Sequence, residues 1–263
     1  MRVASMESDG AERSAHCDVV VLSDGVALME AVAERIVLLC AQASAARGRF
    51  TWALSGGSTP RQLYALLATP RFASRIDWAR VEFFWGDERC VPPDHADSNY
   101  RMVREALFDV IHPDAARVHR MLGEEEPTRA AAAYEAVLRR AFAVRDGGPA
   151  ARFDLVLLGM GADGHTASLF PGTAAVDELS RWVVVNRLSA DSPTRLTLTR
   201  AVIDQAADVL FLVSGASKAA RLKQVLEGSS DGRLLPAQMI RPTNGRLQWL
   251  VDADAASQLE TPR

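Results

Sequence analysis

The chain has 263 residues, a formal net charge of −3 and 48% hydrophobic residues, a composition typical of a soluble globular protein with a sizeable core. The nearly neutral balance gives no global reason to expect nucleic acid or an anionic membrane as a partner. The three cysteines lie far apart and fit neither a disulfide framework nor a zinc motif, which favours a reducing, cytoplasmic location (Cys17, Cys40 and Cys90).

Residues 1–17 mix charged, polar and small side chains and lack the apolar core of a secretory signal, so we expect a disordered tail there. No apolar run approaches the ~18 residues that a membrane span needs. Because no later stretch has the composition of a linker, we expect residues 18–257 to form a single domain.

Strands and helices are expected to alternate along this domain. Apolar or alternating runs predict strands at 18–22, 50–54, 81–85, 118–121, 155–158, 182–186, 194–199, 208–213 and 247–251. Helical spacing of apolar residues and helix-start signals predict helices at 24–46, 60–67, 100–108 and 128–144, with others that begin near 166 and end near 226. The alternation indicates a Rossmann-like α/β fold of three layers (α/β/α) with a mostly parallel sheet.

The turn after the second strand reads SGGSTP, from Ser55 to Pro60. Thr59 suits an N-cap, Pro60 the first helical position and Gln62 a capping box, so a helix is expected to start there. A helix N-terminus exposes backbone N–H groups and the positive end of the helix dipole, which together with hydroxyls hold a phosphate. An ordinary turn with a good cap would look the same, but the paired glycines favour an anion site at Ser55, Gly56, Gly57, Ser58 and Thr59.

Charged residues follow the third strand directly, at Asp87, Glu88 and Arg89. Arg89 is suited to bidentate contact with a phosphate or a carboxylate. The two carboxylates are candidates for an acid or base, for partners of Arg89, or for solvated loop residues. Ser98 or Asn99 is expected to cap the helix that follows.

The run FDLVLLGMGADGH, from Phe153 to His165, is the most informative stretch. A buried strand precedes glycines that let the backbone turn sharply and approach a ligand (Gly159, Gly161 and Gly164). Asp163 and His165 then lie at the carboxyl end of a strand, where open α/β sheets bind ligands. The glycines also satisfy G-x-G-x-x-G, but Asp163 and His165 would crowd a dinucleotide's pyrophosphate. A further reading is that His165 merely caps a helix.

Two basic residues lie near later strands. Arg195 is either a site residue or a surface arginine, and the sequence alone favours neither. Lys218 lies in the loop SGASK at the start of a helix, where a cation opposes the helix dipole and a bound anion would explain its presence. The strand ends after residues 54, 85, 158 and 213 would converge on one edge of the sheet and build one pocket.

Taken together, these motifs resemble those of the 6-phosphogluconolactonase family, part of a larger group that includes glucosamine-6-phosphate deaminases. The similarity runs in order through SGGSTP, GDER, DSNY, GMGADGHTASLFP, RLTLT and SGASK, over residues 18–251. The deaminases carry a catalytic glutamate a few residues after the histidine, whereas here TASLFP follows it, from Thr166 to Pro171, with no carboxylate. Their GDE is also followed by an aromatic residue, where this chain has Arg89. Both differences favour the lactonase branch.

The resemblance implies hydrolysis of 6-phospho-D-glucono-1,5-lactone to 6-phospho-D-gluconate, a step of the oxidative pentose phosphate pathway, with no metal and no cofactor. It implies that His165 is the general base that activates water, that Asp163 orients it, and that glycine-loop amides face the oxyanion. By the same resemblance, the substrate and its phosphate are bound by Ser55, Gly56, Gly57, Ser58, Thr59, Arg89, Gly161, Arg195 and Lys218.

The expected partner is a small-molecule sugar-phosphate lactone, without nucleic acid or membrane, bound by a monomer or small homo-oligomer. The alternatives are a glucosamine-6-phosphate deaminase or sugar-phosphate isomerase, and a non-enzymatic sugar-phosphate sensor. A sensor of the transcription-regulator kind would carry a helix-turn-helix module, for which we expect no room before residue 18 or after residue 251. His112 and His119 lack a spacing typical of a metal pair.

Overall fold

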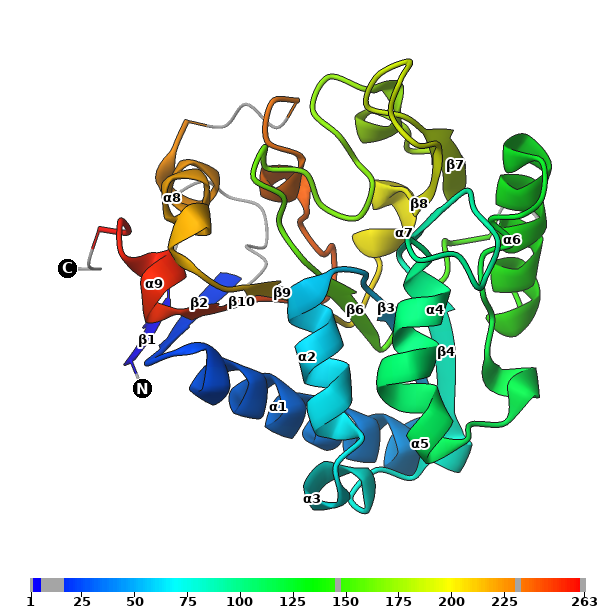
Figure 1. Ribbon diagram of the computed structural model, residues 1–263, viewed down its shortest axis with the longest axis horizontal. Coiled ribbons are helices and arrows are strands. Elements are labelled where there is room, and N and C mark those ends of the chain that lie inside the picture. Colours follow the sequence, from blue (N-terminus) through cyan, green and yellow to red (C-terminus); the bar gives the residue numbers. More distant parts are fainter. Residues whose placement is uncertain (1, 6–16, 145–147, 230–232, 261–263) are drawn as a thin grey trace.

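The computed structural model describes residues 2–5, 17–144, 148–229 and 233–260. Its centre is a seven-stranded sheet, which contains in spatial order β1 (Arg2–Ser5), β2 (Cys17–Leu22), β10 (Arg246–Asp252), β9 (Asp208–Val213), β6 (Leu155–Leu158), β3 (Phe50–Leu54) and β4 (Val81–Trp85) (Figure 1). A second, antiparallel sheet contains β5 (Asp87–Arg89), β8 (Arg195–Leu198) and β7 (Val183–Asn186).

The strands from β2 to β4 in this order pair in parallel. Their residues are mostly apolar and buried, as is usual for parallel sheets that are covered on both faces. The predicted strands at 50–54, 81–85, 155–158 and 208–213 are confirmed residue for residue. β2 begins one residue before its predicted start, and β10 extends one residue beyond its prediction at each end.

The helices are α1 (Gly25–Arg47), α2 (Ser58–Leu67), α3 (Pro70–Ala73), α4 (Asn99–Val103), α5 (Asp109–Ile111), α6 (Pro127–Ala141), α7 (Arg200–Ile203), α8 (Ala219–Glu227) and α9 (Ala253–Ala256). A π-helical turn joins α4 to α5 (Arg104–Phe108), and 3₁₀ turns lie at Trp78–Arg80, Ala115–Arg117, Ala174–Val176, Ala216–Lys218 and Pro236–Met239.

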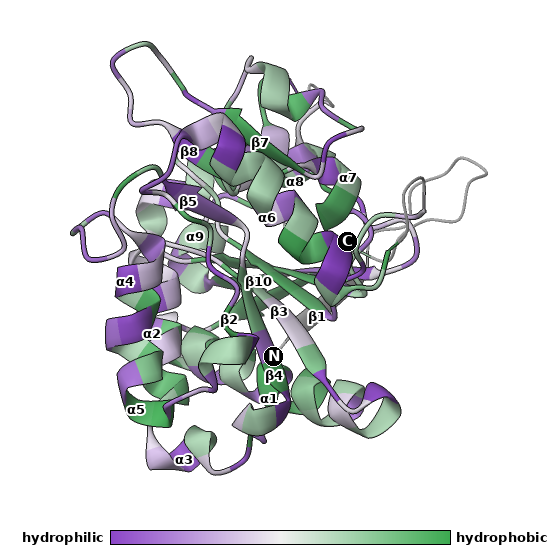
Figure 2. Cartoon of the chain, turned by 90° about the vertical axis from the view of Figure 1, so that its right-hand side faces the viewer, coloured by the Kyte–Doolittle hydropathy of each residue, from purple (hydrophilic) through white to green (hydrophobic). Residues whose placement is uncertain are grey.

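Both views place α1, α2 and α3 on one side of the large sheet and α8 with the small sheet on the other (Figures 1 and 2). The three-layer α/β fold with a mostly parallel sheet is therefore confirmed. Within the described ranges, no helix is long and apolar enough to cross a membrane.

The long helix α1 shows how local signals in the sequence set an element. The Asp24 carboxylate accepts hydrogen bonds from the N–H groups of Val26 and Ala27, each at 2.9 Å, and caps the first turn. Gly48 ends the helix with a φ of 74°, a conformation that favours glycine. The predicted stripe faces the core and is buried (Leu28, Val32, Ile36 and Leu39).

β3 and β6 are joined firmly only at their amino ends. The Asp154 carboxylate accepts hydrogen bonds from the N–H and hydroxyl of Thr51, at 2.8 and 2.9 Å, and the Asp154 N–H donates back to the Thr51 hydroxyl. The ladder between the strands then contains two residue pairs and ends at Ala53 and Val156. Beyond these residues the strands no longer pair with each other, which leaves space between the loops that follow them.

The amino terminus differs from the expected disordered tail over 1–17. Residues 2–5 form β1 and pair antiparallel with β2, with Arg2 opposite Val21, and Cys17 already belongs to β2. Residues 6–16 of that expected tail lie outside the described residues.

Three other predictions need correction. The strand expected at 118–121 is reduced to one bridge between Val118 and Phe83, because the chain there only touches the edge of β4. The helix expected near Thr166 is a tight turn that ends at Leu169, and the helix expected at 128–144 stops at Ala141. The charged loop at 87–89, in contrast, forms β5 and pairs with β8.

Asp204 links the loops that lead into β9 and β10, and it gives the fold a pH dependence. Its carboxylate accepts a hydrogen bond from the Arg241 N–H at 2.8 Å and pairs with Arg200 at 3.3 Å, but burial dominates and raises its pKa to about 6. The folded state therefore favours the protonated carboxyl. The stability that this group contributes is complete below about pH 4 and is lost as the pH rises through 6.

We expect Asp204→Asn to remove this titration. The free energy of unfolding of the variant minus that of the wild type should rise by about 1–3 kcal/mol between pH 4 and pH 7. Urea unfolding at a series of pH values measures this difference, and a difference that does not change with pH would contradict the assignment.

Candidate active site

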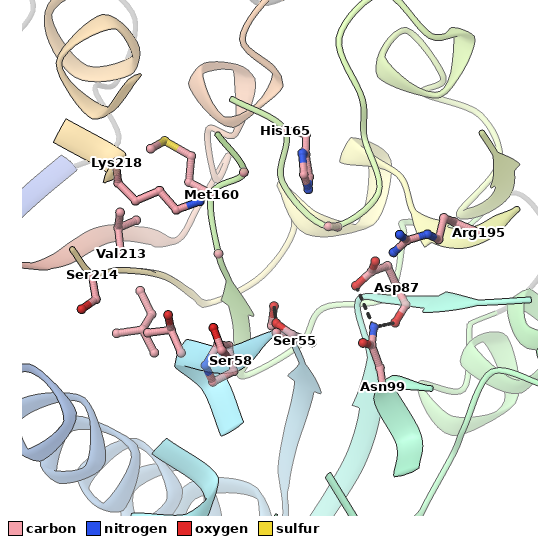
Figure 3. Close-up of a pocket in the computed structure, with 18 of the residues that line it drawn as sticks. Ser55, Ser58, Asp87, Asn99, Met160, His165, Arg195, Val213, Ser214 and Lys218 are labelled. Carbon is pink, nitrogen blue, oxygen red and sulfur yellow. Dashed lines mark hydrogen bonds between the residues drawn. The ribbon is translucent and has the colours of Figure 1, made fainter. Parts of the chain in front are cut away.

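A cleft of about 230 Å³ opens at the carboxyl ends of β3, β6 and β9 (Figure 3). β3 and β6 flank the point where the strand order reverses, because the chain runs outward from β3 to β4, returns to β6 and then continues in the opposite direction. Such points form the ligand crevices of open α/β sheets. All the site residues predicted from the sequence line this cleft except Asp163, which contacts His165 from outside the lining.

The His165 imidazole is held on three sides. Its Nδ1 lies 2.5 Å from Asp163 Oδ1, and the Phe170 ring packs against it at 63° with 4.9 Å between the ring centroids. A Cβ on Gly161 would lie 2.1 Å from Nδ1, so only glycine fits beside the ring. Figure 3 shows the ring extending into the cleft. Nε2 forms no hydrogen bond with any residue that the structure describes, so it is the ring nitrogen left for a ligand.

Asp163 sets the orientation of the imidazole. Burial acts to raise the pKa of Asp163, but the charge that His165 can carry and the hydrogen bonds from its backbone N–H and ring together hold that pKa below its ordinary value. Asp163 therefore stays ionised at neutral pH and accepts a hydrogen bond from Nδ1–H. This arrangement favours the tautomer whose free lone pair is on Nε2.

The loop before α2 differs from the predicted capping box. α2 begins at Ser58, its N-cap is Gly57 with a φ of 104°, and no side chain caps it, so Thr59 lies inside the first turn. The first N–H groups of α2 thus have no side-chain acceptor, and they remain available to an anion. Tyr64 fixes the start of the loop, because its hydroxyl accepts from the Ser55 N–H at 3.0 Å and donates to the Ser55 carbonyl at 2.9 Å.

Lys218 lies just before α8, and Figure 3 shows its side chain extending over the cleft on the side of Ser214 and Ser58. Its ammonium forms no hydrogen bond or ion pair with the residues described. The buried Asp252 fixes the loop, because its carboxylate accepts from the Ser214 hydroxyl and, at 3.0 Å, from the Gly215 N–H. A fixed loop therefore presents an unpaired cation opposite the uncapped start of α2.

Arg89 and Arg195 lie directly opposite each other in β5 and β8. Their buried Nε atoms have no hydrogen-bond partner in the described part of the chain, although Arg89 donates through Nη1 to the carbonyl of Asp97. Like charges opposite each other on paired strands are unfavourable, and burial followed by repulsion from Arg89 lowers the pKa of Arg195. The pair thus offers unused donors and positive charge to a ligand.

Glu88 has a structural role that the sequence did not reveal. It is buried and accepts backbone hydrogen bonds from Arg89 and Asn99, each at 2.7 Å, and from Tyr100 at 2.8 Å, so it covers the start of α4. Burial raises its pKa, and these hydrogen bonds oppose the rise. Ser98 caps α4 as predicted, since its hydroxyl accepts from the Arg101 N–H. Glu88 therefore holds the backbone of Arg89 and does not pair with its guanidinium.

Asp87 does line the cleft, and two neighbours that sequence reasoning missed hold it. The Ser168 hydroxyl donates to Asp87 Oδ2 at 2.6 Å. Asn99 Nδ2 donates to the Asp87 carbonyl at 2.9 Å (Figure 3). Asn99 also packs against Gly56, because a Cβ added at Gly56 would lie 2.0 Å from Asn99 Oδ1. Asn99 lies in the quoted motif DSNY and was considered only as a helix cap, whereas no local signal marks Ser168.

The other ligand classes considered from the sequence lack support in this geometry. The glycine loop does not open a helix as a dinucleotide fingerprint requires, because a tight turn follows His165. For the same reason His165 does not cap a helix. In the described residues, no group of three or more His, Cys, Asp or Glu side chains is arranged to hold a metal ion.

Comparison with known proteins identifies the family. A family model described as glucosamine-6-phosphate isomerases/6-phosphogluconolactonase matches residues 23–249. A 6-phosphogluconolactonase of a Nostoc species is 41% identical over 242 residues, which cover 92% of this chain and 98% of that protein. One of a Synechocystis species is 40% identical with the same coverage.

Solved structures agree. The 6-phosphogluconolactonase from Trypanosoma cruzi matches with a TM-score of 0.83 at 29% identity, over 96% of this chain and 100% of that one. A monomeric glucosamine-6-phosphate deaminase shares the fold with a TM-score of 0.76 at 20% identity, over 91% of this chain and 99% of that one. The chain therefore belongs to the glucosamine-6-phosphate isomerase/6-phosphogluconolactonase family.

Proposed function

We propose that the chain hydrolyses 6-phospho-D-glucono-1,5-lactone to 6-phospho-D-gluconate. The observation that carries the proposal is the free Nε2 of His165 in a cleft whose two ends present unpaired cations, Lys218 at one and Arg195 at the other. The name shared by the curated relatives supplies the substrate, and the cleft supplies groups suited to it.

In the proposed reaction His165 is the general base. Nε2 takes a proton from a water molecule while the water oxygen bonds to the carbonyl carbon of the lactone. The bond from that carbon to the ring oxygen then breaks, and the imidazolium returns the proton to the departing oxygen, which becomes a hydroxyl. The new carboxylic acid releases its proton to solvent. Such catalysis is typically worth about 10²–10⁴-fold in rate.

We assign the phosphate to the end of the cleft where Lys218 faces the start of α2. The uncapped N–H groups, the hydroxyls of Ser58 and Thr59 and the Lys218 ammonium are the donors that a phosphate dianion requires. Arg195 lies across His165 from this end (Figure 3), and Arg89 is opposite Arg195 in β5. We assign both to the sugar hydroxyls and the carboxylate that forms.

The surroundings of His165 favour hydrolysis over deamination. Phe170, which is nearly buried, occupies the region after the histidine where the related deaminases carry their glutamate, and it contributes an apolar ring instead of a proton donor or acceptor. We further propose a cytoplasmic location and a place in the oxidative pentose phosphate pathway. The free thiols of Cys17, Cys40 and Cys90 support the former, since they suit a reducing compartment.

The first test compares the wild-type chain with His165→Ala on freshly generated lactone, with spontaneous hydrolysis subtracted. We expect the wild type to exceed the background clearly, and the variant to lose about 10²–10⁴-fold in kcat because the base is gone. The variant should still bind 6-phosphogluconate, measured by calorimetry, because the proposed anion groups remain. A wild type that releases ammonia from glucosamine 6-phosphate but leaves the lactone untouched would overturn the proposal.

Lys218→Ala should raise KM about 10–100-fold and leave kcat within a few-fold, because a charge-assisted contact to the phosphate is lost in both the ground and transition states. Lys223→Ala is the matched control, since Lys223 lies in α8, the helix that follows Lys218, but pairs with Glu227 and Glu260 at the surface. Equal KM values for the two variants would place the phosphate elsewhere.

Phe170→Leu should lower kcat about 10-fold with little change in KM, because the imidazole loses the ring that limits its rotation. Phe72→Leu, which alters a buried ring in α3, controls for lost packing and should leave kcat unchanged. If both variants behave alike, Phe170 serves the core only.

A further inference from the structure

The turn that follows His165 has a backbone conformation that calls for an explanation. It runs from Thr166 to Leu169, and the Leu169 N–H donates to the Thr166 carbonyl at 2.9 Å. Ala167, inside the turn, has a φ of 47°, in the left-handed region that residues other than glycine rarely adopt. Ala167 also lines the cleft. Unfavourable backbone conformations of this kind persist where the surroundings enforce them, and they cluster at functional sites.

Ser168 enforces the conformation. Ser168 is fully buried, and residues of three strands form hydrogen bonds with its N–H, hydroxyl and carbonyl groups. Its N–H donates to the Thr197 hydroxyl at 3.2 Å, its hydroxyl donates to Asp87 at 2.6 Å, and its carbonyl accepts from Asn186 at 2.7 Å. The turn therefore cannot relax without breaking hydrogen bonds to β5, β7 and β8.

One residue of this turn that lines the cleft has an unused donor. The N–H groups of Ser168 and Leu169 are both bonded within the protein, whereas the Ala167 N–H has no partner in the described residues. The glycine loop has fewer free N–H groups than its sequence implied. The Gly161 N–H donates to the His165 carbonyl at 2.9 Å, and the Gly164 N–H donates to the Gly161 carbonyl at 3.1 Å. Of these amides, that of Ala167 is free and belongs to a residue of the cleft wall.

We propose that the backbone N–H of Ala167 donates a hydrogen bond to the lactone carbonyl oxygen and stabilises the oxyanion that forms when water attacks. This inference rests on the proposed lactonase function. It places the base, His165, and the oxyanion donor two residues apart on one rigid segment, so both keep a fixed position relative to the reacting carbonyl. A donor aimed in advance at the developing charge is among the strongest contributions to such catalysis.

The direct test replaces Ala167 with lactic acid by nonsense suppression, which turns one amide into an ester. This removes that N–H and keeps the Thr166 carbonyl as a somewhat weaker acceptor for the Leu169 N–H. Because the N–H has no partner in the described protein, thermal stability and the affinity for 6-phosphogluconate should change little. We expect kcat to fall about 10²–10³-fold with KM within a few-fold, the usual effect of losing one oxyanion donor. Lactic acid at Ala190, in the exposed loop 187–194, is the matched control and should leave kcat unchanged.

A second variant guards against a poor yield of the ester protein. Ala167→Gly keeps the N–H but frees the backbone, so it should be at least as stable as the wild type and several-fold slower in kcat. A kcat equal to that of the wild type in the ester protein, or a raised KM with unchanged kcat, would overturn the inference. These outcomes differ from failure of the proposed function, in which the wild type itself would not hydrolyse the lactone.

Discussion

The junction between β3 and β6 determines where this protein can bind a ligand. Asp154 and Thr51 lock the amino ends of the two strands together with mutual hydrogen bonds, and the ladder ends after two residue pairs. The loops that follow, which begin at Ser55 and Gly159, therefore face each other across a gap in the middle of the sheet. A sheet that stayed paired to its carboxyl edge would leave no cleft at this point.

The polar groups around that gap are held by other polar groups, and this fixes their positions before any ligand arrives. Asp163 holds the imidazole of His165, Asp252 holds the loop that carries Lys218, and Ser168 holds Asp87. The chain has a net charge of −3, yet its cleft presents cations without carboxylate partners in the described residues. Fixed donors of this kind need little rearrangement when charge develops on a bound molecule.

Much of the fold could be predicted from the sequence, because its signals are local. The buried strands are continuous apolar runs, and α1 is marked by Asp24, Gly48 and an apolar stripe, so both are found without knowledge of their neighbours. The errors arise where tertiary contacts decide. Thr59 carries a good capping signal, but Gly57 takes the N-cap position, and residues 87–89 become a strand only because β8 lies beside them.

The same distinction between local signals and tertiary contacts applies to the candidate site. His165, Asp163 and Lys218 follow glycine-rich strand ends, so local sequence was enough to select them. Asn99, Ser168 and Phe170 were missed or read as structural, because each matters through a contact that only the folded chain creates. The family's motifs helped with the first group because motifs preserve residue types, whereas they say nothing about which amide remains unbonded.

The facing arginines of the small sheet have a consequence for the protein as a whole. Arg89 and Arg195 repel each other across β5 and β8, so the small sheet contributes less to folding than its hydrogen bonds alone would give. A negatively charged occupant relieves this repulsion, and by linkage its binding must strengthen the folded state. Under the proposed function, the resistance of the molecule to heat and proteolysis therefore depends on the concentration of the sugar phosphate that binds there.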